Sequence, residues 1–100
     1  MYRLTTPQHY FTFPEDPSIY KTIVITYYQG DRIVLEKYKE DMTFTGNVGV
    51  CNLTQDETKL FYAGNKVRLQ VRALTETGDA FASDIFTLDV KDVLNDGVLS

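Results

Sequence analysis

The chain has 100 residues, with ten lysines and arginines against fourteen aspartates and glutamates, and a formal net charge of -4 at pH 7. This length accommodates one domain with a shared hydrophobic core and is too short for two. The negative charge and the lack of a basic cluster argue against nucleic acid as a partner. No stretch reaches the roughly 18 apolar residues that a membrane span requires, so we expect no membrane contact.

The inventory of reactive side chains is poor. Cys51 is the only cysteine, which excludes an intramolecular disulfide and a multi-cysteine zinc site, and its apolar surroundings predict a small buried side chain. His9, the only histidine, is interpreted as an edge or surface residue rather than a catalytic base. The segment Asp92–Gly97 resembles part of a calcium loop, but Leu94 stands where an oxygen ligand is needed and no glutamate follows. We expect no enzyme, metal or cofactor, and a small hydrolase is a minor alternative.

Short segments rich in β-branched and aromatic residues follow one another, separated by glycine, asparagine and aspartate. The clearest is Lys66–Ala73, in which apolar residues alternate with polar ones at a period of two. The expected strands are His9–Phe13, Ile19–Gln29, Arg32–Tyr38, Met42–Thr45, Val48–Leu53, Lys66–Ala73 and Ala80–Val90. About seven strands without a helix long enough for a parallel crossover predict an all-β, immunoglobulin-like antiparallel β-sandwich.

Two connections have specific turn chemistry. Gly30-Asp31 predicts a two-residue type II′ hairpin, because glycine stands first. Thr54 and Glu57 have the spacing of a capping box, which predicts one short helical turn that crosses between the sheets. We expect Leu60 or Phe61 to close the end of the core after this turn.

The last expected strand has a break in its pattern. Phe81 is out of phase with Phe86, Leu88 and Val90, so either a bulge resets the register or Phe81 is exposed. We favour a bulge near Ser83-Asp84.

Tyrosines of the second expected strand form a candidate binding surface. Strict alternation places Tyr20 and Tyr28 on one face, opposite Ile23, Ile25 and Tyr27. Tyrosine combines apolar area with a polar tip, which suits contact with a sugar or a protein. The alternative interpretation is plain β propensity.

Residues 92–100 are interpreted as a C-terminal tail of the domain formed by residues 1–91. The tail is too short for a stable element of its own, so it either docks or is free. Its apolar side chains are candidate interface residues: Val93, Leu94, Val98 and Leu99.

Several segments share a pattern with one group of proteins. They are Tyr27–Lys37, Val50–Phe61, Lys66–Arg72, Thr77–Asp79, Ala82–Phe86 and Val90–Leu94. Together they resemble small proteins encoded among the structural genes of phages and prophages of Gram-positive gut bacteria. More loosely, the chain resembles the immunoglobulin-like N-terminal domain of phage baseplate upper proteins, with Phe86 and Val90 in its final Phe-x-x-x-Val strand.

The resemblance implies a non-enzymatic virion component of the tail or baseplate and carries no catalytic residue across. Its partners would be other phage structural proteins, itself or both, which leaves a homo-oligomer open. Residues 1–12 show no signal peptide, so we expect the host cytoplasm during synthesis and then the virion. The chain ends at Ser100, without the receptor-presenting region of baseplate upper proteins, so we expect no host-recognition role. The alternative function is a carbohydrate-binding module whose tyrosines stack on cell-wall glycans.

Overall fold

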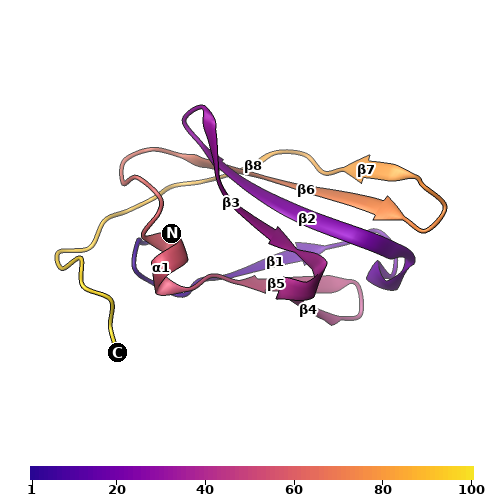
Figure 1. Ribbon diagram of the computed structural model, residues 1–100, viewed down its shortest axis with the longest axis horizontal. Helices are drawn as coiled ribbons and strands as arrows, with labels where there is room; N and C mark the ends of the chain where they lie inside the picture. Colours follow the sequence, from indigo (N-terminus) through magenta and orange to yellow (C-terminus); the bar gives the residue numbers. More distant parts are fainter.

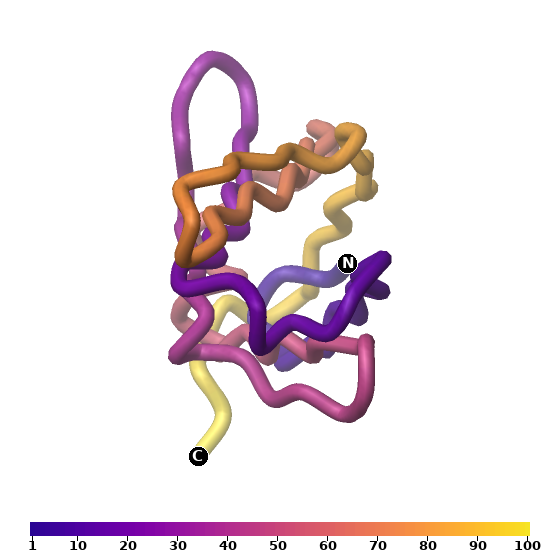
Figure 2. The backbone as a smooth tube through the Cα atoms, turned by 90° about the vertical axis from the view of Figure 1, so that its right-hand side faces the viewer, coloured from indigo at the N-terminus to yellow at the C-terminus, as the bar shows by residue number.

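The computed structural model describes residues 1–100, and its strands form two antiparallel sheets that pack face to face (Figure 1). The smaller sheet has the order β1–β5–β4, with β1 at Gln8–Thr12, β5 at Val48–Asn52 and β4 at Met42–Thr45. The larger sheet runs β3–β2–β6, and both β7 and β8 pair with the outer side of β6. Its strands are β3 (Arg32–Tyr38), β2 (Tyr20–Gln29), β6 (Val67–Thr75), β7 (Ala80–Ala82) and β8 (Phe86–Leu88). In Figure 2 the β6–β7 turn (orange) and the β4–β5 turn (magenta) lie in separate layers. The predicted antiparallel sandwich is confirmed.

The connections follow the immunoglobulin strand order. The smaller sheet corresponds to strands B, E and D, and the larger sheet to strands C′, C, F and G, with β7 and β8 as two halves of G. Three connections cross between the sheets, through the 3-10 turns η1 (Pro17–Ile19) and η2 (Lys39–Asp41) and the single-turn helix α1 (Gln55–Thr58). The position of strand A, beside the free edge of β1, is vacant in residues 1–100.

The turn chemistry read from the sequence holds in the structure. Gly30 has a φ of 67° and Asp31 does not share a positive φ, as a type II′ turn requires. The Thr54 side chain accepts a hydrogen bond from the Glu57 amide, and the Glu57 carboxylate accepts one from the Thr54 amide. Phe61 is the residue that closes the core, whereas Leu60 is half exposed.

The expected bulge near Ser83-Asp84 is also present. Arg72 pairs with Ala82 and Leu69 pairs with Phe86, so three steps along β6 correspond to four steps along the opposite chain. The extra residue brings Phe81 and Phe86 to the same inner face of the larger sheet. Both nevertheless stay half exposed, because no strand of the smaller sheet covers them.

The core fills the space between the sheets, and Cys51 lies fully buried in it, as predicted. The predicted face of Tyr20 is wrong. The register of β2 shifts between Tyr20 and Thr22, which turns Tyr20 to the inner face with Ile23, where it is only 4% exposed. Ile19, expected in the strand, lies in η1 and is partly exposed.

Candidate functional site

Lys91, the last residue before the C-terminal tail, pairs with the N-terminus. Tyr2 and Lys91 form a parallel bridge. The Arg3 amide donates to the Lys91 carbonyl at 2.9 Å, and the Lys91 amide donates to the Met1 carbonyl at 2.8 Å. The tail therefore starts at a position fixed against the N-terminus. Contacts of its own residues Asp92 and Leu99 show that it docks on the domain, one of the two alternatives left open by the sequence.

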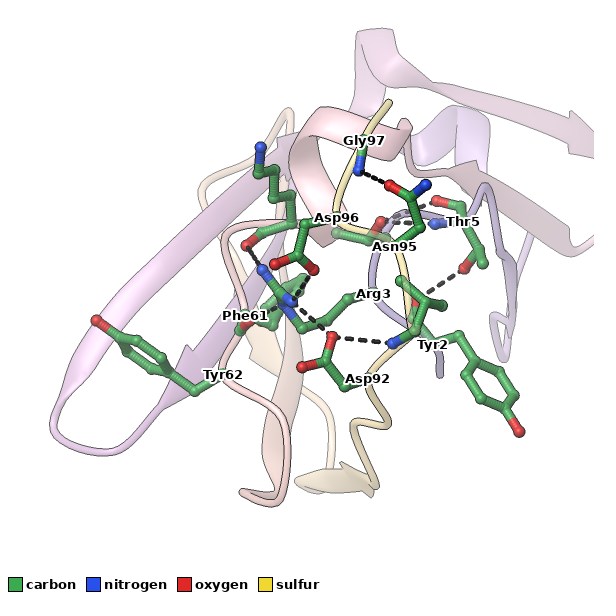
Figure 3. Close-up of polar contacts among 12 residues, drawn as sticks. Tyr2, Arg3, Thr5, Phe61, Tyr62, Asp92, Asn95, Asp96 and Gly97 are labelled. Atoms are coloured by element: carbon green, nitrogen blue, oxygen red, sulfur yellow. Dashed lines mark hydrogen bonds and ion pairs between the residues drawn. The ribbon is translucent and has the colours of Figure 1, made fainter. Parts of the chain in front are cut away.

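Arg3 is the side chain that holds the tail (Figure 3). Its Nη1 donates to the Oδ1 of Asp92 at 2.7 Å and lies 3.4 Å from the Oδ1 of Asp96. Its Nε and Nη2 donate to the carbonyl oxygens of Phe61 and Lys59, at 2.8 and 3.1 Å. The hydrogen bond from Arg3 lowers the pKa of Asp92 below its ordinary value. One guanidinium thus ties the tail to the segment that follows α1.

A second attachment lies near the end of the tail. The Nε2 of Gln55 donates to the Leu99 carbonyl at 3.0 Å, and its Oε1 accepts from the Leu99 amide at 2.7 Å. Gln55 is the first residue of α1, so the helical turn positions this amide. A side-chain amide that pairs with both backbone groups of one residue fixes the direction of the chain there.

These attachments leave most of the predicted tail interface exposed. Leu94 is fully exposed, Leu99 is 78% exposed and Val98 is 47% exposed, whereas Val93 is half-buried. The apolar side chains point to solvent although polar groups hold the backbone in place. The tail is therefore an apolar surface of defined position.

The two predicted strand tyrosines are not brought together. Tyr20 is buried, and Tyr28 lies half-buried on the opposite face of the larger sheet. The guanidinium carbon of Arg68 lies 4.9 Å from the centre of the Tyr28 ring and covers one face of it. The pair cannot act as one stacking platform.

The sequence did not reveal an apolar groove between the free edge of β1 and the strands β7 and β8. Its volume is about 860 Å³. Aromatic side chains from both sheets line it, including Phe11, Phe13, Tyr20, Phe81 and Phe86. The only sequence signal for it was the out-of-phase Phe81.

Reactive side chains do not gather at a surface. The Cys51 thiol is fully buried, and burial raises its pKa. His9 lies on an edge strand, as predicted, but its ring faces the interior, where it contacts Tyr27. No group of three or more histidine, cysteine, aspartate or glutamate side chains is placed to hold a metal ion.

Comparison of the chain with protein-family models, with curated proteins and with solved structures finds no match. No helix of the structure is long and apolar enough to cross a membrane.

Proposed function

We propose that this protein is a non-enzymatic structural component of a phage particle, in the tail or baseplate, and that it acts through protein–protein contacts. The resemblance of segments between Tyr27 and Leu94 to phage structural proteins supports the phage assignment. The immunoglobulin-like strand order agrees with that resemblance, although such a sandwich hosts many functions.

The observation that carries the contact role is the fixed apolar surface of the tail. Leu94, Val98 and Leu99 expose apolar side chains on a backbone that Arg3 and Gln55 hold. Exposed apolar side chains that gather in one patch mark interaction sites, and these three lie within six residues of one another along the tail. The partner is another structural protein of the particle or a second copy of this chain.

Particle purification tests the phage assignment. The protein, carrying an epitope tag, is expressed from its own locus in the bacterium that encodes it, and particles are purified on a density gradient after induction. We expect the tag at a fixed ratio to the other particle proteins. A tag confined to the soluble host fraction would contradict the proposal.

Tail deletion tests the contact role. Removing Asp92–Ser100 leaves Val90 and the rest of the core intact, so we expect a folded domain that no longer assembles with its partner or itself. The variant Leu94→Asp should weaken assembly without deletion, and Ile33→Asp, at an exposed apolar residue of β3, serves as its control. Assembly is measured by size exclusion with light scattering, and unchanged assembly after deletion argues against the tail.

Glycan binding is the competing function. A glycan array with Tyr28→Ala as the variant distinguishes the two, because specific binding to wall polysaccharide that this variant loses would favour a carbohydrate-binding module.

A further inference from the structure

The free edge of β1 has unpaired backbone groups. The Phe13 amide donates to the Asn47 carbonyl at 2.8 Å, next to the paired residues Thr12 and Val48. The backbone amides and carbonyls of the odd-numbered residues of β1 are therefore the ones that point toward β5. Alternation in an antiparallel pair then directs the amides and carbonyls of Gln8, Tyr10 and Thr12 away from β5. Charged side chains, which commonly protect such edges, are absent from β1.

The larger sheet extends past this edge. The ring contacts His9–Tyr27 and Phe13–Tyr20, with centres 5.6 and 5.9 Å apart, place β1 over β2. Beyond β2, the inner side chains of β6 are still buried, whereas Phe81 of β7 and Phe86 of β8 are half exposed.

The uncovered inner face is apolar. Phe81 and Phe86 are 56% and 49% exposed, although both belong to the face that is buried elsewhere in the sheet. Each aromatic ring leaves on the order of 100 Å² uncovered. The groove beneath β1 is therefore a strand position with an apolar floor, and it coincides with the vacant position of strand A.

We propose that an extended segment of a second protein occupies this position and pairs antiparallel with β1. Only a peptide backbone offers donors and acceptors at the spacing that Gln8, Tyr10 and Thr12 present, and strand addition to a free edge is an established mode of peptide recognition. Every second side chain of the segment faces inward and is apolar, to cover Phe81 and Phe86.

The charges of the groove define the segment further. Glu15 is the only charged side chain among the lining residues, and it follows the C-terminal end of β1. The N-terminal end of an antiparallel segment lies beside it. The partner segment is therefore uncharged over about five residues, the length of a typical strand, with a lysine or arginine at its N-terminal end.

A second copy of this chain does not meet these requirements. Two-fold pairing of β1 with β1 puts both larger sheets on the same side, and because each extends past β1, they would occupy the same space. The tail of another copy carries Asp92, Asp96 and Gly97 and no basic residue after Lys91. A strand of about five uncharged residues with one flanking residue at each end buries on the order of 1,000 Å² in total in the groove, which suits a weak, specific contact.

A designed peptide tests the site. The probe is acetyl-KVTVTVT-amide, whose valines alternate with threonines, and it is titrated into the uniformly ¹⁵N-labelled protein. We expect the amide signals of Gln8, Tyr10 and Thr12 to shift and their hydrogen exchange to slow. No change at β1 with millimolar peptide would overturn the proposal.

Variants of the edge and of the groove floor show whether the peptide binds as a strand. Tyr10→Pro removes an outward-facing amide that β5 does not use, so the fold should persist while affinity falls at least tenfold. Phe81→Asp should weaken binding similarly, and Leu60→Asp should leave it unchanged.

Glu15→Lys tests the orientation of the segment. It should weaken binding of this peptide and strengthen binding of a peptide that has glutamate in place of the lysine. Equal binding of both peptides by both proteins would contradict the predicted orientation.

Two other occupants would each overturn the proposal. One is a second copy of this chain: light scattering would then show a dimer, and Tyr10→Pro would dissociate it. The other is a small apolar ligand: dodecanoate would then shift the NMR signals of the groove residues, and the peptide would not. The phage assignment is tested separately. If purified particles lacked the protein, that assignment would fail, but peptide binding at β1 would not be affected.

Discussion

The Nδ1 of His9 lies 2.7 Å from the hydroxyl oxygen of Tyr27, in the interior between the two sheets. Tyr27 is fully buried and His9 is half-buried. Burial lowers the pKa of His9 and raises the pKa of Tyr27, so both side chains are neutral near pH 7. The hydrogen bond joins the smaller sheet to the larger one and satisfies the Tyr27 hydroxyl.

The lowered pKa of His9 predicts a pH-dependent stability. Between the ordinary histidine pKa near 6.5 and the lower pKa in the fold, the unfolded chain binds more protons than the folded one. The free energy of unfolding should therefore rise with pH in this window. The contribution of His9 to stability is lost as pH falls from about 7. Urea denaturation between pH 5.5 and 8 measures it. His9→Gln keeps a hydrogen-bonding group for Tyr27 and does not titrate, so a slope of the same size in this variant would refute the assignment to His9.

Arg3 should contribute to stability as well as to the position of the tail. Arg3→Ala leaves the carbonyls of Phe61 and Lys59 without this donor, and we expect a loss of about 1 kcal/mol in the free energy of unfolding. Arg3→Lys should recover only part of it, because an ammonium group cannot match the fork of a guanidinium. Urea denaturation provides the comparison, with Lys21→Ala, at an exposed lysine, as control.

The same variant has a second signature at Asp92. The pKa of this carboxyl is low because Arg3 donates to it, so the contact is complete above the ordinary aspartate pKa and is lost as pH falls through the lowered one. In Arg3→Ala the NMR titration midpoint of Asp92 should rise toward the ordinary value. A midpoint that stays where it was would show that Arg3 does not hold Asp92 in solution.

Gln55→Ala should release the end of the tail and leave the domain unchanged. The amide of Leu99 loses its acceptor and its carbonyl loses its donor, and both lie at the surface, so the stability change should be below about 0.5 kcal/mol. The heteronuclear NOE values of Val98 and Leu99 should fall. The substitution Gln8→Ala on β1 serves as control, and equally ordered tail residues in both variants would count against the attachment.

Local features of this fold could be predicted because they depend on neighbouring residues. The alternation of Val67, Leu69 and Val71 predicted a strand with one buried face, and the spacing of Thr54 and Glu57 predicted the capped turn. The phase break around Phe81 predicted the bulge. In each case a backbone hydrogen-bonding pattern or a period of two is written directly in the sequence.

Features that depend on distant residues could not be predicted. The register shift after Tyr20 arises from pairing of β2 with β6, about fifty residues away, and it reverses the face that simple alternation assigns. The contact of Arg3 with Asp92 joins the two ends of the chain. The vacant strand position needs the strand order of both sheets, so neither it nor the half-exposed Phe86 could be inferred from composition or periodicity.

Gly49 lies in the middle of the smaller sheet, at a place where a side chain does not fit. A Cβ atom there would come within 2.7 Å of the Met42 Cε and 2.9 Å of the Phe44 Cε1. The methionine end can move aside, but the ring of Phe44 is stiffer, so Gly49→Ala should lower the free energy of unfolding by about 1 to 3 kcal/mol. Thermal or urea denaturation measures this loss.

Two further variants separate crowding from other effects at Gly49. Adding Phe44→Leu to Gly49→Ala relieves the contact, so the double variant should lose less stability than the two single changes combined. Gly97→Ala, in the exposed tail, should change stability by less than about 0.5 kcal/mol. If Gly49→Ala behaves like Gly97→Ala, the centre of the smaller sheet is less tightly packed than these distances indicate. If the losses in the double variant simply add, the ring of Phe44 is not what limits the space.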